Sequence, residues 1–271
     1  MTVLPGGARV LHRLALAVEV LDALTSRPVT APVTVHREGS RRQFLNRGGR
    51  FLLLFGPAVG DRADLRITDA TRQVVPRRFR IPLWSLTDVE AADRVPPGLY
   101  IPALSRALRV WLSPGATGVS GPGFTVIRGR VVRGTEPVRW PRIAARGPGG
   151  VIVGRAHGDD RGEFVLPVTG LGTMPPPAPS QITVDLLVYA RGPAGPPPPT
   201  PRQLALDPLA DLPLEAVARS SSPPLPSDLD NALLRGASLP PFYVPSTAPV
   251  IPQDVDVGDL VLLQESLQFS P

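Results

Sequence analysis

The sequence predicts an all-β protein with two small β-sandwiches in tandem, followed by an extended proline-rich arm. Three observations predict this class: a repeated pattern, short apolar runs bounded by turn residues, and many glycines and prolines. The chain has 271 residues, of which 26 are glycine and 36 are proline, and this length suits about two domains. Because proline and glycine favour turns and edge strands, we expect short strands with frequent turns.

The repeat is clearest around two phenylalanines. Residues 46–54 read Asn-Arg-Gly-Gly-Arg-Phe-Leu-Leu-Leu, and residues 159–167 read Asp-Asp-Arg-Gly-Glu-Phe-Val-Leu-Pro. Each is a polar, glycine-containing turn that leads into an aromatic residue and an apolar run. The flanks repeat too: Pro28-Val29 matches Pro137-Val138, and residues 76–83 are echoed by residues 201–209. The offset grows from 109 to 113 to 125 residues, which indicates one fold with loop insertions.

In the first copy, apolar residues alternate over residues 14–20, which predicts a half-buried strand. Prolines bracket a turn before a β-branched strand at 33–35. The turn 46–49 contains residues that tolerate positive φ, so the chain can reverse into a strand at 51–55. Further short strands are expected at 65–68 and 79–81. Several short strands with a turn about every ten residues are typical of a sandwich.

Between the copies, Ser85 is the expected N-cap of a short helix over residues 85–92, with acidic residues near its positive end. Alternation over residues 107–112 predicts one more strand, and Trp84 and Trp111 are expected to fasten this bridge to a sandwich. In the second copy, the sequence predicts strands at residues 124–132, 138–145, 151–153, 163–168 and 182–189.

These elements divide the chain into four parts. We expect a β-sandwich domain at residues 1–84, a bridge at 85–119, a second sandwich at 120–210 and an extended arm at 211–271. Residues 120–206 are expected to fold independently, with Phe164 in the core because it follows the clearest turn signal. The arm has weak periodicity and many prolines, so it cannot build a core of its own and should dock on another surface. We expect it to lie along a neighbouring subunit, with a terminal strand at residues 260–263 that adds to an exposed sheet edge; the alternative is that it folds back on its own sandwiches.

The second copy resembles a known family. The strand Gly129-Arg130-Val131-Val132, the pair Pro137-Val138 and the turn Asp160-Arg161-Gly162-Glu163-Phe164 are similar to the carboxypeptidase regulatory-like domain, a small transthyretin-like β-sandwich. The resemblance covers roughly residues 124–190, with a fainter version at 14–83 where Asn46 and Arg47 replace the acidic turn residues. It implies a fold and no catalysis.

Charge is distributed unevenly along the chain. Net charge is +6, and all 29 basic residues are arginine; a GC-rich genome encodes such a bias without selection for function. Residues 1–118 carry 17 arginines against 9 acidic residues, residues 119–206 carry 10 against 5, and residues 207–271 carry 2 against 9. The acidic arm is therefore expected to meet a basic surface, its own or a neighbour's.

The compartment is expected to be cytoplasmic. The chain has no cysteine, so disulfides and thiolate metal sites are excluded. The apolar stretch 14–21 is interrupted by Glu19 and is much shorter than the roughly 20 residues of a membrane span. We therefore expect no export signal and no membrane span.

Candidate catalytic and metal sites are weak. Only His157, of three histidines, has carboxylates nearby, at Asp159, Asp160 and Glu163, and a polar hairpin turn predicts the same residues. Ser120 lacks the glycine two residues later that a nucleophile elbow requires, and Gly147-Pro148-Gly149-Gly150 lacks the third glycine of a dinucleotide loop. The sequence predicts no catalytic residue, no metal and no cofactor.

The function expected is that of a noncatalytic structural or adaptor subunit in a large assembly. The stretch 156–164, in a tandem protein without an export signal, is similar to accessory components of phage-tail-like contractile injection particles. Nucleic-acid binding is an alternative, through phosphate contacts of Arg41, Arg42, Arg77, Arg78 and Arg80 and stacking on Phe79; carbohydrate binding by the outer loops is another. The expected partner-binding residues all lie in the arm: Phe242, Tyr243, Val244, Val250, Ile251, Leu260 and Leu262.

Overall fold

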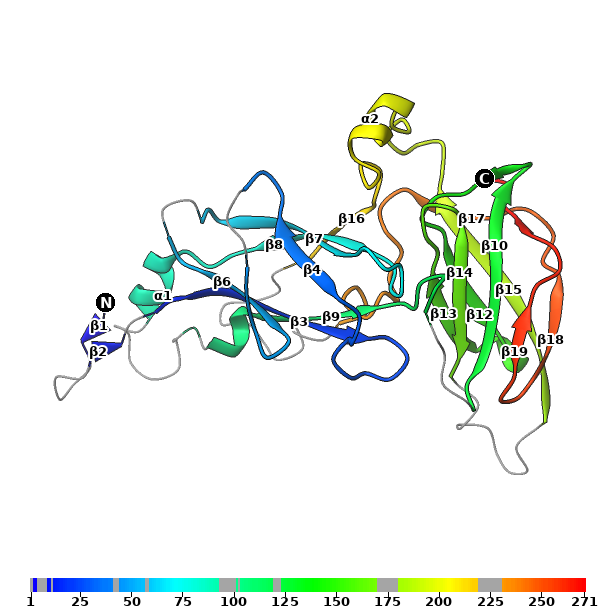
Figure 1. The fold of residues 1–271 in the computed structure, drawn as a ribbon, viewed down its shortest axis with the longest axis horizontal. Helices are drawn as coiled ribbons and strands as arrows, with labels where there is room; N and C mark the ends of the chain where they lie inside the picture. Colours follow the sequence, from blue (N-terminus) through cyan, green and yellow to red (C-terminus); the bar gives the residue numbers. More distant parts are fainter. Residues whose placement is uncertain are drawn as a thin grey trace.

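The computed structural model describes residues 2–3, 9–10, 12–40, 44–56, 59–92, 101, 103–118, 123–169, 180–218 and 231–271. Strands dominate it, and they form two bodies that lie side by side (Figure 1). The predicted all-β class is confirmed. Near the N-terminus, β1 (Thr2–Val3) and β2 (Arg9–Val10) form a separate two-stranded sheet. No described helix is both long and apolar enough to cross a membrane.

The first body consists of two four-stranded sheets around one core. One sheet has the order β5 (Leu45–Arg47), β6 (Arg50–Leu54), β3 (Leu14–Asp22), β9 (Ala107–Leu112). The other has the order β16 (Leu214–Ala216), β8 (Arg77–Pro82), β7 (Arg62–Asp69), β4 (Val33–Arg37). The predicted alternation is realised in β8, where Phe79 and Ile81 are buried and Arg78 and Arg80 lie on the other face. We call this body the first sandwich.

The second body, the second sandwich, has two five-stranded sheets. One contains β11 (Glu136–Pro137), β10 (Thr125–Arg133) and β14 (Glu163–Val168), with β19 (Leu260–Leu262) and β20 (Leu267–Gln268) also paired to β10. The other contains β13 (Ile152–His157), β12 (Arg142–Arg146) and β15 (Gln181–Arg191), with β17 (Tyr243–Pro245) and β18 (Pro252–Asp256) paired to β15. A 3-10 turn at Pro148–Gly150 links β12 to β13.

Phe164 lies in the core of the second sandwich, as predicted, and is only 2% exposed. It pairs across the ladder with Gly129, and a Cβ at that glycine would come within 2.9 Å of the Phe164 ring. The absence of a side chain at Gly129 therefore lets the ring pack flat on the neighbouring strand. This contact gives Gly129, the first residue of the strand that carries the family resemblance, a physical role.

The two sandwiches share a pattern of strand pairing. β3 pairs antiparallel with β6, and β10 pairs antiparallel with β14. β4 pairs with β7 as β12 pairs with β15. A parallel strand covers the other side of each first strand: β9 on β3, and β19 and β20 on β10. Whether these shared pairings reflect a duplication stays a prediction.

The C-terminal residues differ from the expected arm. We expected that no paired sheet would enclose residues 211–271 and that they would lie along a neighbouring subunit; instead β16 pairs with the first sandwich and β17 to β20 pair with the second. Val255 and Phe269 are buried in the second core. The periodicity was weak because each strand has only two to five residues and takes its partner from distant sequence. A fragment ending at residue 206 or 210 therefore lacks part of its own core.

Residues 192–242 form a connecting segment between β15 and β17, of which 192–218 and 231–242 are described. It leaves the second sandwich, contributes β16 to the first, and inserts the fully buried Leu234 into the first core. It also contains α2 (Pro201–Leu206), within the residues that echo residues 76–83, which include β8. Thr200 and Gln203 cap this helix reciprocally and Pro201 occupies its first turn, so local capping overrides the resemblance to residues 76–83.

The predicted bridge also contributes to the first sandwich. Its helix α1 (Leu86–Ala92) begins after Ser85, whose Oγ accepts a hydrogen bond from the Asp88 amide at 3.0 Å. A 3-10 turn at Ala103–Arg106 then leads into β9, which pairs parallel to β3. Trp111 in β9 is 5% exposed and packs in the first core. The parallel pairing of β9 with β3 thus makes residues 107–112 part of the first sheet.

Candidate functional site: the junction between the sandwiches

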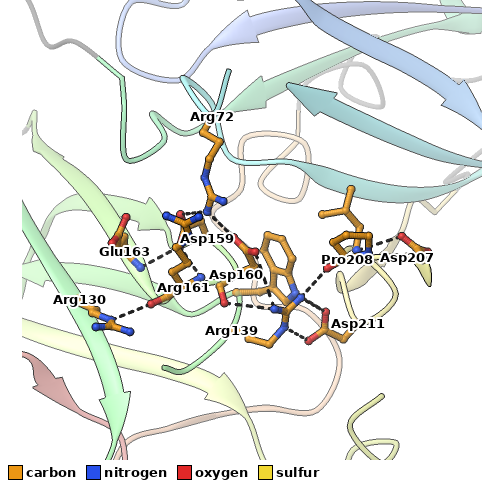
Figure 2. A network of polar contacts seen from close by, with 12 residues as sticks. Arg72, Arg130, Arg139, Asp159, Asp160, Arg161, Glu163, Asp207, Pro208 and Asp211 are labelled. Carbon is orange, nitrogen blue, oxygen red and sulfur yellow. Dashed lines mark hydrogen bonds and ion pairs between the residues drawn. The ribbon is translucent and has the colours of Figure 1, made fainter. Parts of the chain in front are cut away.

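The acidic turn that marks the second copy lies against the first sandwich (Figure 2). Within the turn, Asp159 Oδ1 accepts hydrogen bonds from the backbone amides of Arg161 and Glu163, which fixes the hairpin. Gly162 has φ +75°, and a Cβ at this residue would lie 2.4 Å from the Val131 carbonyl oxygen, so only glycine fits there. The other carboxylate oxygen of Asp159 remains free to bind outside the turn.

Arg72 supplies that outside contact from the first sandwich. Its Nη2 donates to Asp159 Oδ2 at 2.6 Å and also to Asp160, and both bonds are visible in Figure 2. Arg72 follows β7 in a turn where its φ is +61°. Although partial burial lowers its pKa, the two carboxylates raise it above the usual value for arginine. The hairpin of one sandwich and the turn of the other are therefore tied by a doubly paired guanidinium.

A second group of contacts ties the connecting segment to the same region. Arg139 binds Asp211 through two hydrogen bonds, at 2.7 and 2.9 Å, and the indole of Trp140 donates to Asp211 at 2.8 Å. On the first sandwich, Arg66 of β7 donates to Asp207 at 2.6 Å. Burial alone would raise the pKa of Asp207, but its bond with Arg66 lowers it. Two carboxylates of the connecting segment are thus paired with arginines: Asp211 with Arg139 of the second sandwich, and Asp207 with Arg66 of the first.

The centre of the junction is a buried charge triad of Arg77, Glu215 and Arg142. Each comes from a different part: Arg77 from β8, Glu215 from β16 of the connecting segment, and Arg142 from β12. Their exposed fractions are 1%, 2% and 6%. Arg77 pairs with Glu215 through bonds of 3.0 and 2.5 Å, and Arg142 lies 3.6 Å from the same carboxylate.

The guanidinium of Arg77 is fully satisfied. Besides its two bonds to Glu215, it donates to the backbone carbonyls of Trp111, Leu233 and Leu234 at 2.6 to 2.9 Å. These five bonds equal the five N–H donors that an arginine possesses. The ring of Phe79 lies 4.5 Å from its charged centre and adds a cation–π contact. Such complete pairing offsets the cost of removing the charge from water.

Two further polar groups of the second sandwich are buried beside the triad. Burial lowers the pKa of Arg142, and nearby Arg77 lowers it further; an arginine nevertheless stays protonated. His157, 2% exposed, donates from Nε2 to the carbonyl of Gly236 at 3.2 Å. Burial, then Arg142 and Arg77, lower its pKa well below 6.5. His157 is therefore held neutral, with its ring against the connecting segment.

The junction also contains the residues of the metal candidate considered in the sequence. Asp159 and Asp160, which with His157 formed the weak metal candidate, bind Arg72 instead. Among the described residues, no group of three or more His, Asp or Glu side chains could hold a metal ion. The arrangement stabilises a fixed relation of two sandwiches and a connecting segment.

The arginines that could have contacted phosphates are engaged as well. Arg77 is buried in the triad, Arg78 binds Glu38 and Arg80 binds Asp64. Phe79 has no exposed surface, so it cannot stack on a base. Arg77 and Phe79 therefore cannot take the roles expected of them in the nucleic-acid alternative, whereas phosphate contacts of the partly exposed Arg78 and Arg80 stay a prediction. Arg41 and Arg42 lie outside the described residues.

The seven predicted partner-binding residues fall into two places. Phe242, Tyr243 and Val244 lie next to the junction: the Tyr243 hydroxyl donates to the Trp140 carbonyl at 2.7 Å, burial raises the pKa of Tyr243 to about 12, and Val244 packs on the second core. Phe242 is 55% exposed, at a φ of +66°. The remaining four are exposed on or beside the edge strands of the second sandwich: Val250, Ile251, Leu260 and Leu262. Their binding to a partner stays a prediction.

Sequence reasoning missed the triad, although one signal for it was present. Arg77 lies two residues before Phe79 and four before Ile81, so the alternation places it on the inward face. Its partner Glu215 lies 138 residues away and carries no such signal. Comparison with known proteins found no matching family model, no similar curated protein and no similar solved structure. The resemblance to the carboxypeptidase regulatory-like domain therefore remains a prediction.

Proposed function

We propose that this chain is a noncatalytic structural or adaptor subunit of a large protein assembly. The observation that carries the proposal is the triad of Arg77, Glu215 and Arg142, which joins two sandwiches and the connecting segment at one buried point. Three parts held at one buried point, where the guanidinium of Arg77 is fully paired, are expected to move as a unit, which suits a spacer or adaptor.

The use of the reactive side chains supports the same proposal. The carboxylates of Asp159, Asp160 and Glu215 bind guanidinium groups, and His157 is buried against Gly236. In an enzyme, such groups face a cleft and await substrate. Here they stabilise the junction, while five of the exposed aliphatic side chains lie close together in the sequence, between residues 250 and 262 of the second sandwich.

The finer proposal is an accessory subunit of a phage-tail-like contractile injection particle, at the cap, sheath, tube or baseplate. It rests on the resemblance of residues 156–164, and in the structure this stretch forms the end of β13 and the hairpin of the junction. A compact sandwich pair with a fixed junction suits a component that transmits position between neighbours.

The test is isolation of the assembly from the cell that makes the protein. The chain should carry a tag at its N-terminus, because Phe269 near the other end is buried. Cleared lysate is then fractionated by size on a gradient. We expect the chain in a fraction much heavier than the 28.8 kDa monomer, together with the same partner proteins in repeated preparations, and sheath and tube proteins among them if the finer proposal holds.

A variant with a broken triad, Glu215→Ala, provides the matched control, since it should lose incorporation together with the fixed junction. Recovery of the wild-type chain only as a free monomer would contradict the proposal. Recovery in a heavy particle without sheath or tube proteins would contradict the finer proposal alone.

A further inference from the structure

The outer side of the second sandwich carries an unusual set of exposed aliphatic side chains. Between residues 250 and 262, five are 40–59% exposed: Val250, Ile251, Val257, Leu260 and Leu262. They belong to β18, β19 and their flanking turns. β18 closes one sheet and β19 the other, and the chain reverses between them at 257–259, so the five residues share one side. We call these five residues the distal edge; in Figure 1 it lies on the side away from the first sandwich.

Acidic residues flank the distal edge. Residues 236–271 contain four acidic residues and no arginine or lysine. Asp254 and Asp256 bind the neutral side chains of Thr183 and Gln181, so their charges are not neutralised by these contacts. Within the described residues, β19 pairs with β10 alone, which leaves its other backbone edge open. An open edge of this kind accepts a further strand.

The first sandwich presents an edge of complementary character. β5 has three exposed residues, Leu45, Asn46 and Arg47, and pairs only with β6 among the described strands. Leu45 is 47% exposed. The sequence from residue 37 to 50 contains five arginines and one acidic residue. We call β5 with Arg50 the basic edge. β5 has the same length as β19, three residues, and Leu45 offers an exposed apolar side chain to the distal edge. Arg47 and Arg50 are opposite in charge to the acidic residues that flank the distal edge, although Arg50 also pairs with Glu19 at 3.3 Å.

We infer that the distal edge of one copy binds the basic edge of a second copy, by strand addition of β5 to β19. The first and second sandwiches lie at opposite sides of the molecule (Figure 1), so the two edges of one chain cannot meet each other. Because two different surfaces meet, a pair of bound copies leaves one distal edge and one basic edge open. Such heterologous contacts repeat to give a filament or a ring. The inference rests on the proposed structural function and gives it a partner, a second copy of this chain.

The test begins with the purified full chain in sedimentation velocity experiments at rising concentration. We expect oligomers that grow with concentration at about 50 mM salt and dissociate at about 500 mM, because the Debye length becomes shorter than the spacing of paired charges. Single variants Leu45→Asp and Leu262→Asp should each be monomeric. Both positions are exposed, so the melting temperature should stay unchanged and separates a lost contact from lost folding.

The decisive step is to mix the two variants. Leu45→Asp keeps an intact distal edge and Leu262→Asp keeps an intact basic edge, so the mixture should form a dimer of one copy of each and no larger species. Leu206→Asp is the matched control, since Leu206 is 80% exposed on α2, outside both edges; it should assemble like the wild type.

Several results would overturn the inference. These are a wild-type chain that stays monomeric at about 1 mM, a mixture that stays monomeric, or a Leu206→Asp variant that is also impaired. Dimers of Leu45→Asp alone would instead indicate a symmetric contact between two distal edges, and would equally overturn it. A monomeric wild-type chain that still enters a heavy particle in the cell would remove this inference and leave the proposed function standing.

Discussion

Removal of the carboxylate of Glu215 should destabilise the protein strongly. The Glu215→Ala change leaves the guanidinium groups of Arg77 and Arg142 together in an interior where they are 1% and 6% exposed. Two charge-assisted hydrogen bonds are lost, at 3.0 and 2.5 Å, and each contributes roughly 1.5–3 kcal/mol. Breaking a buried ion pair by removing one partner costs about 3–5 kcal/mol. We therefore expect a loss of about 3–5 kcal/mol in the free energy of unfolding.

Urea denaturation followed by tryptophan fluorescence measures this loss, since Trp111 and Trp140 both adjoin the junction. Two variants sharpen the comparison. Glu215→Gln keeps the shape and one acceptor oxygen but removes the charge, so it should lose less than Glu215→Ala. Asp185→Ala breaks the half-exposed pair with Arg146 and should cost less than about 1 kcal/mol. If Glu215→Ala cost no more than Asp185→Ala, the triad would not hold the junction together.

Three further predictions follow from the second sandwich and its surroundings. Phe164→Ala should cost roughly 3–5 kcal/mol in urea denaturation, because the ring is 2% exposed and packs on Gly129; unchanged stability would contradict its place in the core. The free energy of unfolding should fall as the pH drops below about 6.5, by up to about 1.4 kcal/mol per pH unit for each histidine. The pKa of His157 is lowered in the folded state by burial and by Arg142 and Arg77, so the unfolded state takes up the proton first and the contribution is complete only above the unfolded value. His157→Asn should reduce that slope and leave the smaller part due to His36, whose pKa burial also lowers; an unaltered slope would contradict a neutral buried ring. Deletion of residues 243–271 should unfold the second sandwich, since it removes Val255 and Phe269 from the core, and hydrogen exchange should then show β10 and β15 unprotected while β3 stays protected; protection of all three strands would contradict the strand assignment.

The strands with clear alternation could be predicted from the sequence because local pattern decides which face is buried. β8 is of this kind, whereas β3 and β14 were predicted as strands but are buried on both faces. Phe164 was placed correctly in the core because the turn before it fixes where the strand begins. Of the short C-terminal strands, β19 coincides with the strand expected at residues 260–263, although it pairs within the chain. The strands β16, β17, β18 and β20 could not be predicted, because two to five residues carry too little pattern and their partners lie far away in the sequence. The pairing of Arg77 with Glu215 also could not be predicted from the sequence. A charged residue on the inward face of a strand indicates that it has a buried partner, but its position does not identify that partner.

The two repeated turns show how one local structure acquires different chemistry in different surroundings. In the second sandwich, the turn at Asp159 and Asp160 faces Arg72 across the junction, and both carboxylates are paired. In the first sandwich, the corresponding residues are Asn46 and Arg47, and they are exposed. The backbone requirement is the same in both turns and is met by glycine at positive φ: Gly48 and Gly49 in one, Gly162 in the other.

The two turns therefore differ in their outward-facing side chains. The hairpin backbone constrains only the glycine positions, so the other residues can differ between the two turns. The acidic version is used within the chain, against an arginine of the other sandwich. The version with Arg47 lies on the basic edge, for which we infer an acidic partner in a second copy. If that inference is correct, Arg47→Asp should impair association of copies and leave the free energy of unfolding within about 0.5 kcal/mol of the wild type, because an exposed substitution disturbs no internal contact. Restoration of association by a matching Asp259→Arg change in the partner copy would assign the contact to these two residues, and failure of both changes to alter association would remove charge pairing from the interface.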